Sequence, residues 1–172
     1  YPQELEESVQ MEGKAFLLRP IRPEDGERLR AFYEGATPAD MRLRFFMSRR
    51  EVPTSELARY SQIDYDREMT FVALAATDDG QQQMVGEARA VCDPDNVTAE
   101  FALQVASEWQ GRGLGRKLLE KLVGYLRQRG VKEIVGECLQ ENRRMATLAA
   151  DLGFDVRPHA SQEVLAMRLP LQ

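Results

Sequence analysis

The chain has 172 residues, of which 43% are hydrophobic and 30% are charged. This length predicts one compact domain, since domains average roughly 150 residues. No apolar run approaches the roughly 20 residues that a membrane-spanning helix requires, and the hydrophobic content excludes wholesale disorder. We therefore expect a soluble globular protein that has no membrane partner.

The net charge of −5 comes from 23 basic and 28 acidic residues. An acidic chain disfavours nonspecific binding to nucleic acid, because attraction to phosphates needs a net basic surface. The charge is uneven, however, since residues 112–144 hold nine basic and four acidic side chains and the rest of the chain carries −10. This concentration of positive charge suits one compact polyanion.

Only two cysteines, Cys92 and Cys138, and one histidine, His159, are present. They are too few for a Cys/His zinc cluster, and no carboxylate loop of the calcium type occurs, so we expect no metal site. Cys138 stands in a strand pattern and is expected to be a buried structural thiol. The acidic first residues lack the features of a secretory signal, which predicts a cytoplasmic protein.

Residues 1–14 are polar and lack periodicity, so we expect a linker or tail before a domain that spans 15–172. Within that domain, strand and helix patterns alternate. The first half predicts a strand over 15–19, a helix from Pro23 to about Glu34, a helix or turn over 39–46, a helix from Thr54 to about Ile63, and strands over 69–76, 84–92 and 98–105. The second half predicts a helix that begins at Leu114 and is stopped by Gly130, a strand over 133–139, a helix over 142–152, and a closing pair over 154–156 and 163–169. The order indicates an α/β fold with a mixed sheet.

The predicted strand over 98–105 alternates between two kinds of side chain. Phe101, Leu103 and Val105 fall on one face, which we expect to join the core. Glu100 and Gln104 fall on the other face with Ala102, and that face is available for a ligand.

The segment Gln110-Gly111-Arg112-Gly113-Leu114-Gly115 stands between this strand and a basic amphipathic helix. Glycines let the backbone approach a ligand closely with its N–H groups, and the following helix adds its positive N-terminal end. The spacing fits neither the dinucleotide fingerprint nor the P-loop. The segment therefore predicts a phosphate-binding loop, although a tight strand-to-helix connection would also account for the glycines alone.

This loop resembles the acetyl-CoA pyrophosphate loop of the GNAT superfamily of N-acetyltransferases, whose pattern Gln/Arg-x-x-Gly-x-Gly/Ala is filled here by Gln110, Gly113 and Gly115. Further matches follow at Ile21-Arg22-Pro23-Glu24-Asp25, Glu141-Asn142-Arg143 and Leu152-Gly153-Phe154, so the resemblance covers about residues 15–169. It implies the α+β GNAT fold, a mixed and mostly antiparallel sheet flanked by helices, with acetyl-CoA as cosubstrate.

Other segments are similar to the acetyltransferase domain of bacterial protein lysine acetyltransferases. These segments are Tyr1-Pro2, Arg42-Leu43-Arg44-Phe45-Phe46, residues 63–69 and Ala99-Glu100-Phe101-Ala102. The resemblance implies transfer of an acetyl group to a protein lysine, including the active-site lysine of an acetyl-CoA synthetase. In such proteins the domain is often fused behind an acyl-CoA synthetase-like region.

An amine attacks a thioester only when it is neutral, and a lysine with an ordinary pKa is neutral in about four parts in ten thousand at pH 7. A general base, or a water relay to one, is therefore needed. Glu100 is the predicted base, because it shares the exposed strand face with Gln104 and the resemblance places the catalytic glutamate there. The alternative is a solvated strand carboxylate.

The resemblance also assigns the groups that bind the cosubstrate. It places the backbone N–H groups of the strand at Gln104 and Val105 beside the thioester carbonyl. The expected cofactor-binding set is Gln104, Val105, Gln110, Gly111, Arg112, Gly113, Leu114, Gly115, Arg116 and Asn142. Asn142 is equally well explained as a helix N-cap, and the two arginines as a solvated helix face.

Ala149 stands where many relatives carry the tyrosine that protonates the departing thiolate, so the usual general acid is missing. Tyr65 and Tyr125 are the substitutes that remain, and solvent could also supply the proton. Two other functions stay open at this point. The acceptor could be a small-molecule amine, or the domain could be a regulatory sensor that binds acyl-CoA without turnover.

Overall fold

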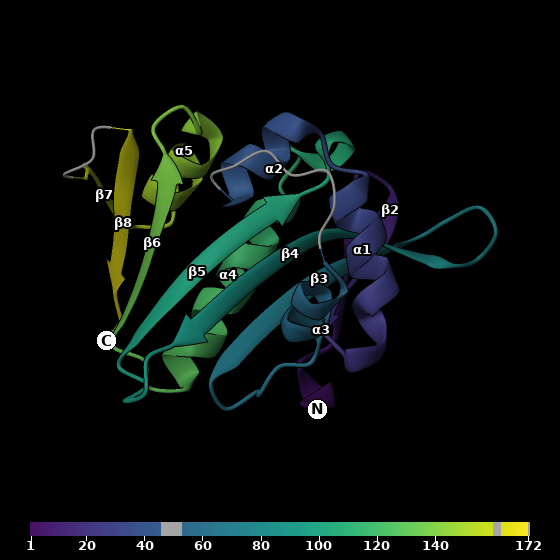
Figure 1. Ribbon diagram of the computed structural model, residues 1–172, viewed down its shortest axis with the longest axis horizontal. Helices are drawn as coiled ribbons and strands as arrows, with labels where there is room; N and C mark the ends of the chain where they lie inside the picture. The colour runs from purple at the N-terminus through teal and green to yellow at the C-terminus, as the bar shows by residue number, and fades with distance from the viewer. Residues whose placement is uncertain (46–52, 160–162, 172) are drawn as a thin grey trace.

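The computed structural model describes residues 1–45, 53–159 and 163–171. Within these residues, the strands form one sheet in the order β1-β2-β3-β4-β5-β6-β8-β7 (Figure 1). They are β1 (Glu7–Met11), β2 (Lys14–Pro20), β3 (Glu68–Ala76), β4 (Gln82–Cys92), β5 (Thr98–Val105), β6 (Glu133–Leu139), β7 (Asp155–Pro158) and β8 (Val164–Pro170). The predicted mixed, mostly antiparallel sheet is confirmed.

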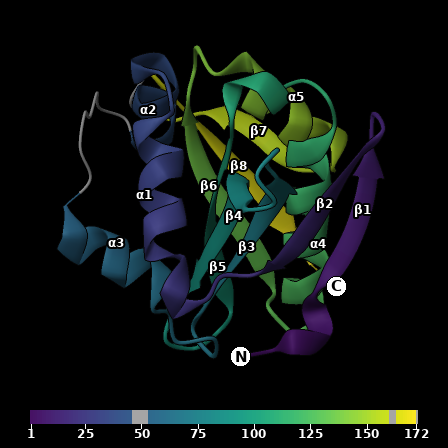
Figure 2. The same cartoon turned by 90° about the vertical axis from the view of Figure 1, so that its right-hand side faces the viewer.

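Helices cover both faces of this sheet, as Figure 2 shows. On one side lie α1 (Gly26–Glu34), α2 (Pro38–Phe45) and α3 (Thr54–Ser61), and on the other lie α4 (Leu114–Gln128) and α5 (Arg143–Asp151). Short 3-10 turns, η1 (Gln3–Leu5), η2 (Pro23–Asp25) and η3 (Ser107–Trp109), complete the chain order. None of the described helices combines the length and the apolar character needed to cross a bilayer.

Two apolar clusters fill the space between the sheet and the helices. The larger cluster packs the leucines of α4 against β2 to β5, and the smaller one packs Leu29, Phe32 and Tyr33 of α1 against β3 and β4. The expected core face of β5 is confirmed at Phe101 and Val105, which are buried, while Leu103 is partly buried against the larger cluster. The predicted helix or turn over 39–46 is confirmed as α2 up to Phe45, while Phe46 lies outside the described residues.

The expectation of a tail over residues 1–14 is wrong for β1, which pairs antiparallel with β2 from Glu7 to Met11. This edge strand is polar because one of its faces meets solvent, whereas Val9 and Met11 pack against the larger cluster. A short strand with charged residues is typical of a sheet edge. Such a strand buries too few side chains to give a clear periodic signal.

Only β5 and β6 among the paired strands run parallel, and their pairing is short. It extends from Thr98 to Glu100 on β5 and from Glu133 to Val135 on β6. Beyond these residues the backbones of β5 and β6 are no longer paired, and the two strands diverge (Figure 1). The divergence opens the central part of the sheet and positions the site described below.

Gly136 follows the last residue of β6 that pairs with β5, and it leaves room for the ring of Phe101. A Cβ atom at Gly136 would lie 2.5 Å from Cε1 of the Phe101 ring. We therefore expect Gly136→Ala to lower the free energy of unfolding by about 1–3 kcal/mol, the usual cost of overpacking a core. Urea denaturation measures this loss, and Gly124→Ala, in open space on α4, provides a control that should not be destabilised. Equal stability of both variants would contradict the close packing at Gly136.

Candidate active site

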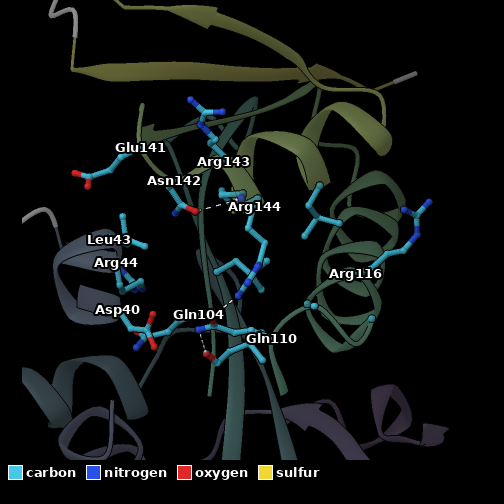
Figure 3. A pocket seen from close by; sticks show the side chains of 17 residues that line it. Asp40, Leu43, Arg44, Gln104, Gln110, Arg116, Glu141, Asn142, Arg143 and Arg144 are labelled. Carbon is cyan, nitrogen blue, oxygen red and sulfur yellow. Dashed lines mark hydrogen bonds between the residues drawn. The ribbon is translucent and has the colours of Figure 1, made fainter. Parts of the chain in front are cut away.

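A cavity of about 500 Å³ lies where β5 and β6 diverge (Figure 3). Leu103, Gln104 and Val105 of β5 line one part of it, and the glycine loop, residues 110–115, lines another. Residues 141–145 and Leu148 line a third part. Residues of α2 close the remaining side. The site is thus assembled from segments that are far apart in the sequence and meet only because the sheet opens.

The backbone of β5 presents unpaired amides to this cavity. The Ala106 amide donates to the Val85 carbonyl at 2.8 Å, so in the alternating antiparallel ladder the Gln104 amide also faces β4. The amides of Leu103 and Val105 face the gap beside β6 instead. Of the two amides expected to stabilise a carbonyl oxygen, only that of Val105 is therefore directed toward the cavity.

The glycine loop adopts a conformation that side chains disfavour. Gly111 has a φ of +72° and Gly113 a φ of +97°, both in the left-handed region. Gly113 is the N-cap of α4 and offers no side chain to the first amides of that helix. Free amides at a helix N-terminus, together with the helix dipole, are groups that can bind an anion such as a phosphate.

Gln110 fixes this loop to the two walls of the cavity. Its side-chain amide donates to the Val105 carbonyl at 3.0 Å, and its side-chain oxygen accepts a hydrogen bond from Arg144 of α5. The loop is therefore held to the end of β5 and to the helix that follows β6. This arrangement fits a long ligand with an anionic end at α4 and a less polar arm along β5.

Several expected binding residues do lie at the cavity. Gln110, Gly111, Gly113, Gly115, Arg116 and Asn142 line it together with Gln104 and Val105. Asn142 also caps α5, because its side-chain oxygen accepts a hydrogen bond from the Met145 amide at 3.2 Å. Both interpretations of this residue are therefore compatible with the structure.

Two expected residues do not line the cavity. Arg112 forms an ion pair with Glu12 at 2.8 Å and lies over the Trp109 ring, so its guanidinium is directed to the β1–β2 turn. Leu114 is fully buried in the core, because it begins the apolar stripe of α4. Only the backbone of Leu114 can belong to the phosphate site.

The sequence did not single out the residues that α2 brings to the cavity, which are Asp40, Leu43 and Arg44. Asp40 accepts a hydrogen bond from the Ser107 hydroxyl at 2.7 Å, and Arg42 forms an ion pair with Glu141. These contacts hold α2 to the chain segments after β5 and β6. The Arg42–Phe46 segment and the Glu141–Arg143 segment had been noted only as family matches, which was the available signal.

Glu100 is exposed and lies outside the cavity, on the same strand face as Gln104. Its neighbours in register are Val91 of β4 and Val135 of β6. Gln104 differs in being buried, with its Nε2 at 3.8 Å from the sulfur of Met41 and its Oε1 without a hydrogen-bond partner. The face expected to be open is therefore open at Glu100 and covered by α2 at Gln104.

The other side chains considered from the sequence take no part in the cavity. Tyr65 and Tyr125 both donate their hydroxyls to backbone carbonyls elsewhere, and Ala149 is fully buried. Burial raises the pKa of the Cys138 thiol, which disfavours the reactive thiolate. His159 lies beside Glu137 at 3.5 Å and does not line the cavity.

The sequence of this chain is similar to those of several known proteins. The model of the acetyltransferase (GNAT) family matches residues 37–154. An acetyltransferase of Pseudomonas aeruginosa is 34% identical over 143 residues, which cover 83% of this chain and 76% of that protein. The acetyltransferase Pat of Mycolicibacterium smegmatis is 32% identical over 144 residues, which cover 82% of this chain but only 41% of Pat.

Among solved structures, the GNAT domain of S. lividans PAT has a TM-score of 0.88 and 26% sequence identity, and the match covers 99% of both chains. The expected GNAT fold is therefore confirmed for the described residues. The chain belongs to the GNAT family of acetyltransferases.

Proposed function

We propose that this domain transfers an acetyl group from acetyl-CoA to a lysine side chain of a protein. The observation that carries the proposal is the layout of β5. The C-terminal end of β5 lies at the cavity, near the glycine loop, while Glu100 in the N-terminal half of the strand is exposed to solvent. A cosubstrate and a large acceptor can therefore approach the same strand from different sides.

The residues present fit acetyl-CoA, which would supply an acetyl group activated as a thioester. The amides at Gly113 and in the first turn of α4 would hold the pyrophosphate, and Arg116 beside them would add positive charge. Met145 and Leu148 give the α5 wall an apolar surface for the arm of the cosubstrate. The Val105 amide is directed to stabilise the thioester oxygen.

Glu100 would act as the general base. A lysine acceptor must lose a proton before it attacks, and a solvated carboxylate can accept that proton through water. Gln104 lies four positions after Glu100, or about 13 Å along the strand. The proton would therefore pass through one or more water molecules rather than directly.

An exposed base favours a protein acceptor over a small molecule. Pockets for small molecules usually bury 70–90% of their ligand, whereas Glu100 is exposed and its neighbour Val91 is 42% exposed. An open strand face of this kind suits a lysine presented on the surface of another protein. The similarity of the Arg42–Phe46 and Ala99–Ala102 segments to bacterial protein lysine acetyltransferases supports the same acceptor.

The test is thiol release from acetyl-CoA by the purified domain. One set of reactions contains an acetyl-CoA synthetase as acceptor, and a parallel set contains polyamines, amino acids and aminoglycosides. Acetylation of one synthetase lysine with no reaction on small amines is the expected result. Turnover on a small amine alone would refute the protein acceptor, and tight binding without thiol release on any acceptor would favour a sensor.

Gly113→Ala should weaken the binding of acetyl-CoA about tenfold or more. Alanine at a φ of +97° is strained, and relief of that strain would turn the loop amides away from the phosphates. Isothermal titration calorimetry measures the affinity. Gly80→Ala is a matched control, because Gly80 also has a positive φ of +82° but lies in the β3–β4 loop. Equal affinities of the two variants would contradict the assignment of the loop.

A further inference from the structure

We propose that Arg44 stabilises the negative charge that forms on the CoA sulfur when the acetyl group leaves. The inference rests on the proposed use of acetyl-CoA and adds a catalytic residue to it. It also supplies a substitute for the general acid that is absent at Ala149.

The transfer leaves a charge that some group must accommodate. The neutral amine nitrogen forms a bond to the acetyl carbon, the carbon–sulfur bond breaks, and its electron pair remains on sulfur as a thiolate. The extra proton on nitrogen passes to the general base. Among the described residues that line the cavity there is no tyrosine, cysteine or histidine, so a neutral acid is not at hand. A fixed cation at the cavity would stabilise the thiolate without any proton donor.

Arg44 lies at the end of the cavity where the sulfur belongs. The glycine loop and Arg116 are on one side of the cavity, and Arg44 is on the opposite side beside Gln104 (Figure 3). A cosubstrate anchored by its phosphates at α4 therefore extends its thioester toward α2. The Arg44 side chain is only 11% exposed, so water screens its charge weakly.

The charge of Arg44 is only partly neutralised within the described residues. Its Nε lies 3.5 Å from Oε1 of the buried Glu87, beyond ordinary hydrogen-bond length, and that nitrogen has no hydrogen-bond partner. Arg89 approaches the other oxygen of the same carboxylate at 3.7 Å. Tyr33 donates its hydroxyl to Glu87 at 2.5 Å.

One carboxylate thus lies between two guanidinium groups, and the described cluster of Arg44, Glu87 and Arg89 carries one excess positive charge. An uncompensated cation in a buried position favours a nearby anion. Arg44 is the member of the cluster that reaches the cavity. A thiolate bound there would complete the neutralisation.

Other charged and titratable groups face Arg44 from each neighbouring element. They are Asp40 of α2, Glu87 and Arg89 of β4, Tyr33 of α1, Tyr60 of α3, Glu137 and Cys138 of β6, Glu141 before α5, and Arg143 and Arg144 of α5. Burial raises the pKa of the Cys138 thiol. Burial raises the pKa of Tyr33 and of Tyr60, so neither ionises near neutral pH. Carboxyl and guanidinium groups of model peptides titrate outside the range from pH 6.5 to 9. A change of CoA affinity in this range therefore reports the thiol of CoA.

The experiment compares the binding of CoA and of desulfo-CoA by isothermal titration calorimetry between pH 6.5 and 9. For the wild-type domain, the affinity ratio of CoA to desulfo-CoA should rise about fivefold or more as the thiol ionises. In Arg44→Gln the ratio should stay nearly flat, while desulfo-CoA binding remains close to wild type. Arg44→Lys should keep part of the rise, because it keeps the charge. Arg127→Gln, an exposed arginine near the end of α4, should behave as wild type.

A second variant changes the cluster in the opposite direction. Glu87→Gln removes the shared carboxylate without changing its size, so the ratio should rise more steeply than in the wild type. This variant tests the proposal even if Arg44→Gln does not fold, which thermal denaturation would reveal. A flat ratio in the wild type, or an unaltered rise in both variants, would overturn the role of Arg44. Failure of both ligands to bind would instead overturn the proposed use of acetyl-CoA.

Discussion

Glu100→Gln is expected to lower kcat about 100-fold at pH 7 while leaving the affinity for acetyl-CoA unchanged. Glutamine has nearly the same size but accepts no proton, so the acceptor lysine would have to reach its neutral form without help. The deficit should shrink as the pH rises toward 10, because more of the lysine is then already neutral. A pH series of kcat with a synthetase acceptor measures both effects.

The matched control for this variant is Glu4→Gln, which changes an exposed carboxylate on η1 away from the cavity. It should keep wild-type turnover. If Glu100→Gln also kept wild-type turnover, Glu100 would not be the base. Another carboxylate on this sheet face, Glu87, lies opposite Gln104, is fully buried and accepts the hydroxyl of Tyr33.

Asp25→Asn is expected to lower the free energy of unfolding by about 3–5 kcal/mol, the usual cost of breaking a buried ion pair. Both oxygens of Asp25 accept hydrogen bonds from Arg19 at 2.7 Å, and the two residues are at most 2% exposed. The asparagine would leave the charge of Arg19 buried and uncompensated. For a domain of this size the melting temperature should fall by roughly 6–20 °C.

The controls separate this ion pair from a general effect of substitution. Asp151→Asn at the exposed end of α5 should leave the melting temperature unchanged. The double variant Arg19→Met/Asp25→Asn removes the buried charge as well and should be more stable than Asp25→Asn alone. The single variant Arg19→Met completes the comparison. If the double variant lost as much free energy of unfolding as Arg19→Met and Asp25→Asn together, the two side chains would have no coupling energy.

The difference in stability between the wild type and Asp25→Asn should also depend on pH. Burial by itself would raise the pKa of Asp25, but the hydrogen bonds from Arg19 and from the Arg22 amide outweigh it and the pKa lies below its ordinary value. A lowered pKa in the folded state stabilises the protein above the pKa of the unfolded state. The difference between wild type and Asp25→Asn should therefore be full at pH 7 and should shrink below about pH 4, where thermal melts can follow it.

Much of the fold follows from local patterns. The alternation over residues 98–105 and the leucine spacing of 114–126 predict β5 and α4, and the glycine loop between them predicts an anion site. These signals are strong because each element buries one full face. β1 was missed because an edge strand buries little, and the polar residues on its outer face hide the pattern.

The sequence by itself predicted the family, the order of the elements from β2 onward and the glycine loop that suits a phosphate, because these depend on residues close together in the chain. It could not show that Arg112 pairs with Glu12 or that α2 brings Arg44 to the cavity. Those contacts join residues far apart in sequence, and they arise only when β5 and β6 diverge and α2 packs across the opening. Charge and burial at the site are therefore set by tertiary packing, which cannot be predicted from the spacing of residues within one segment.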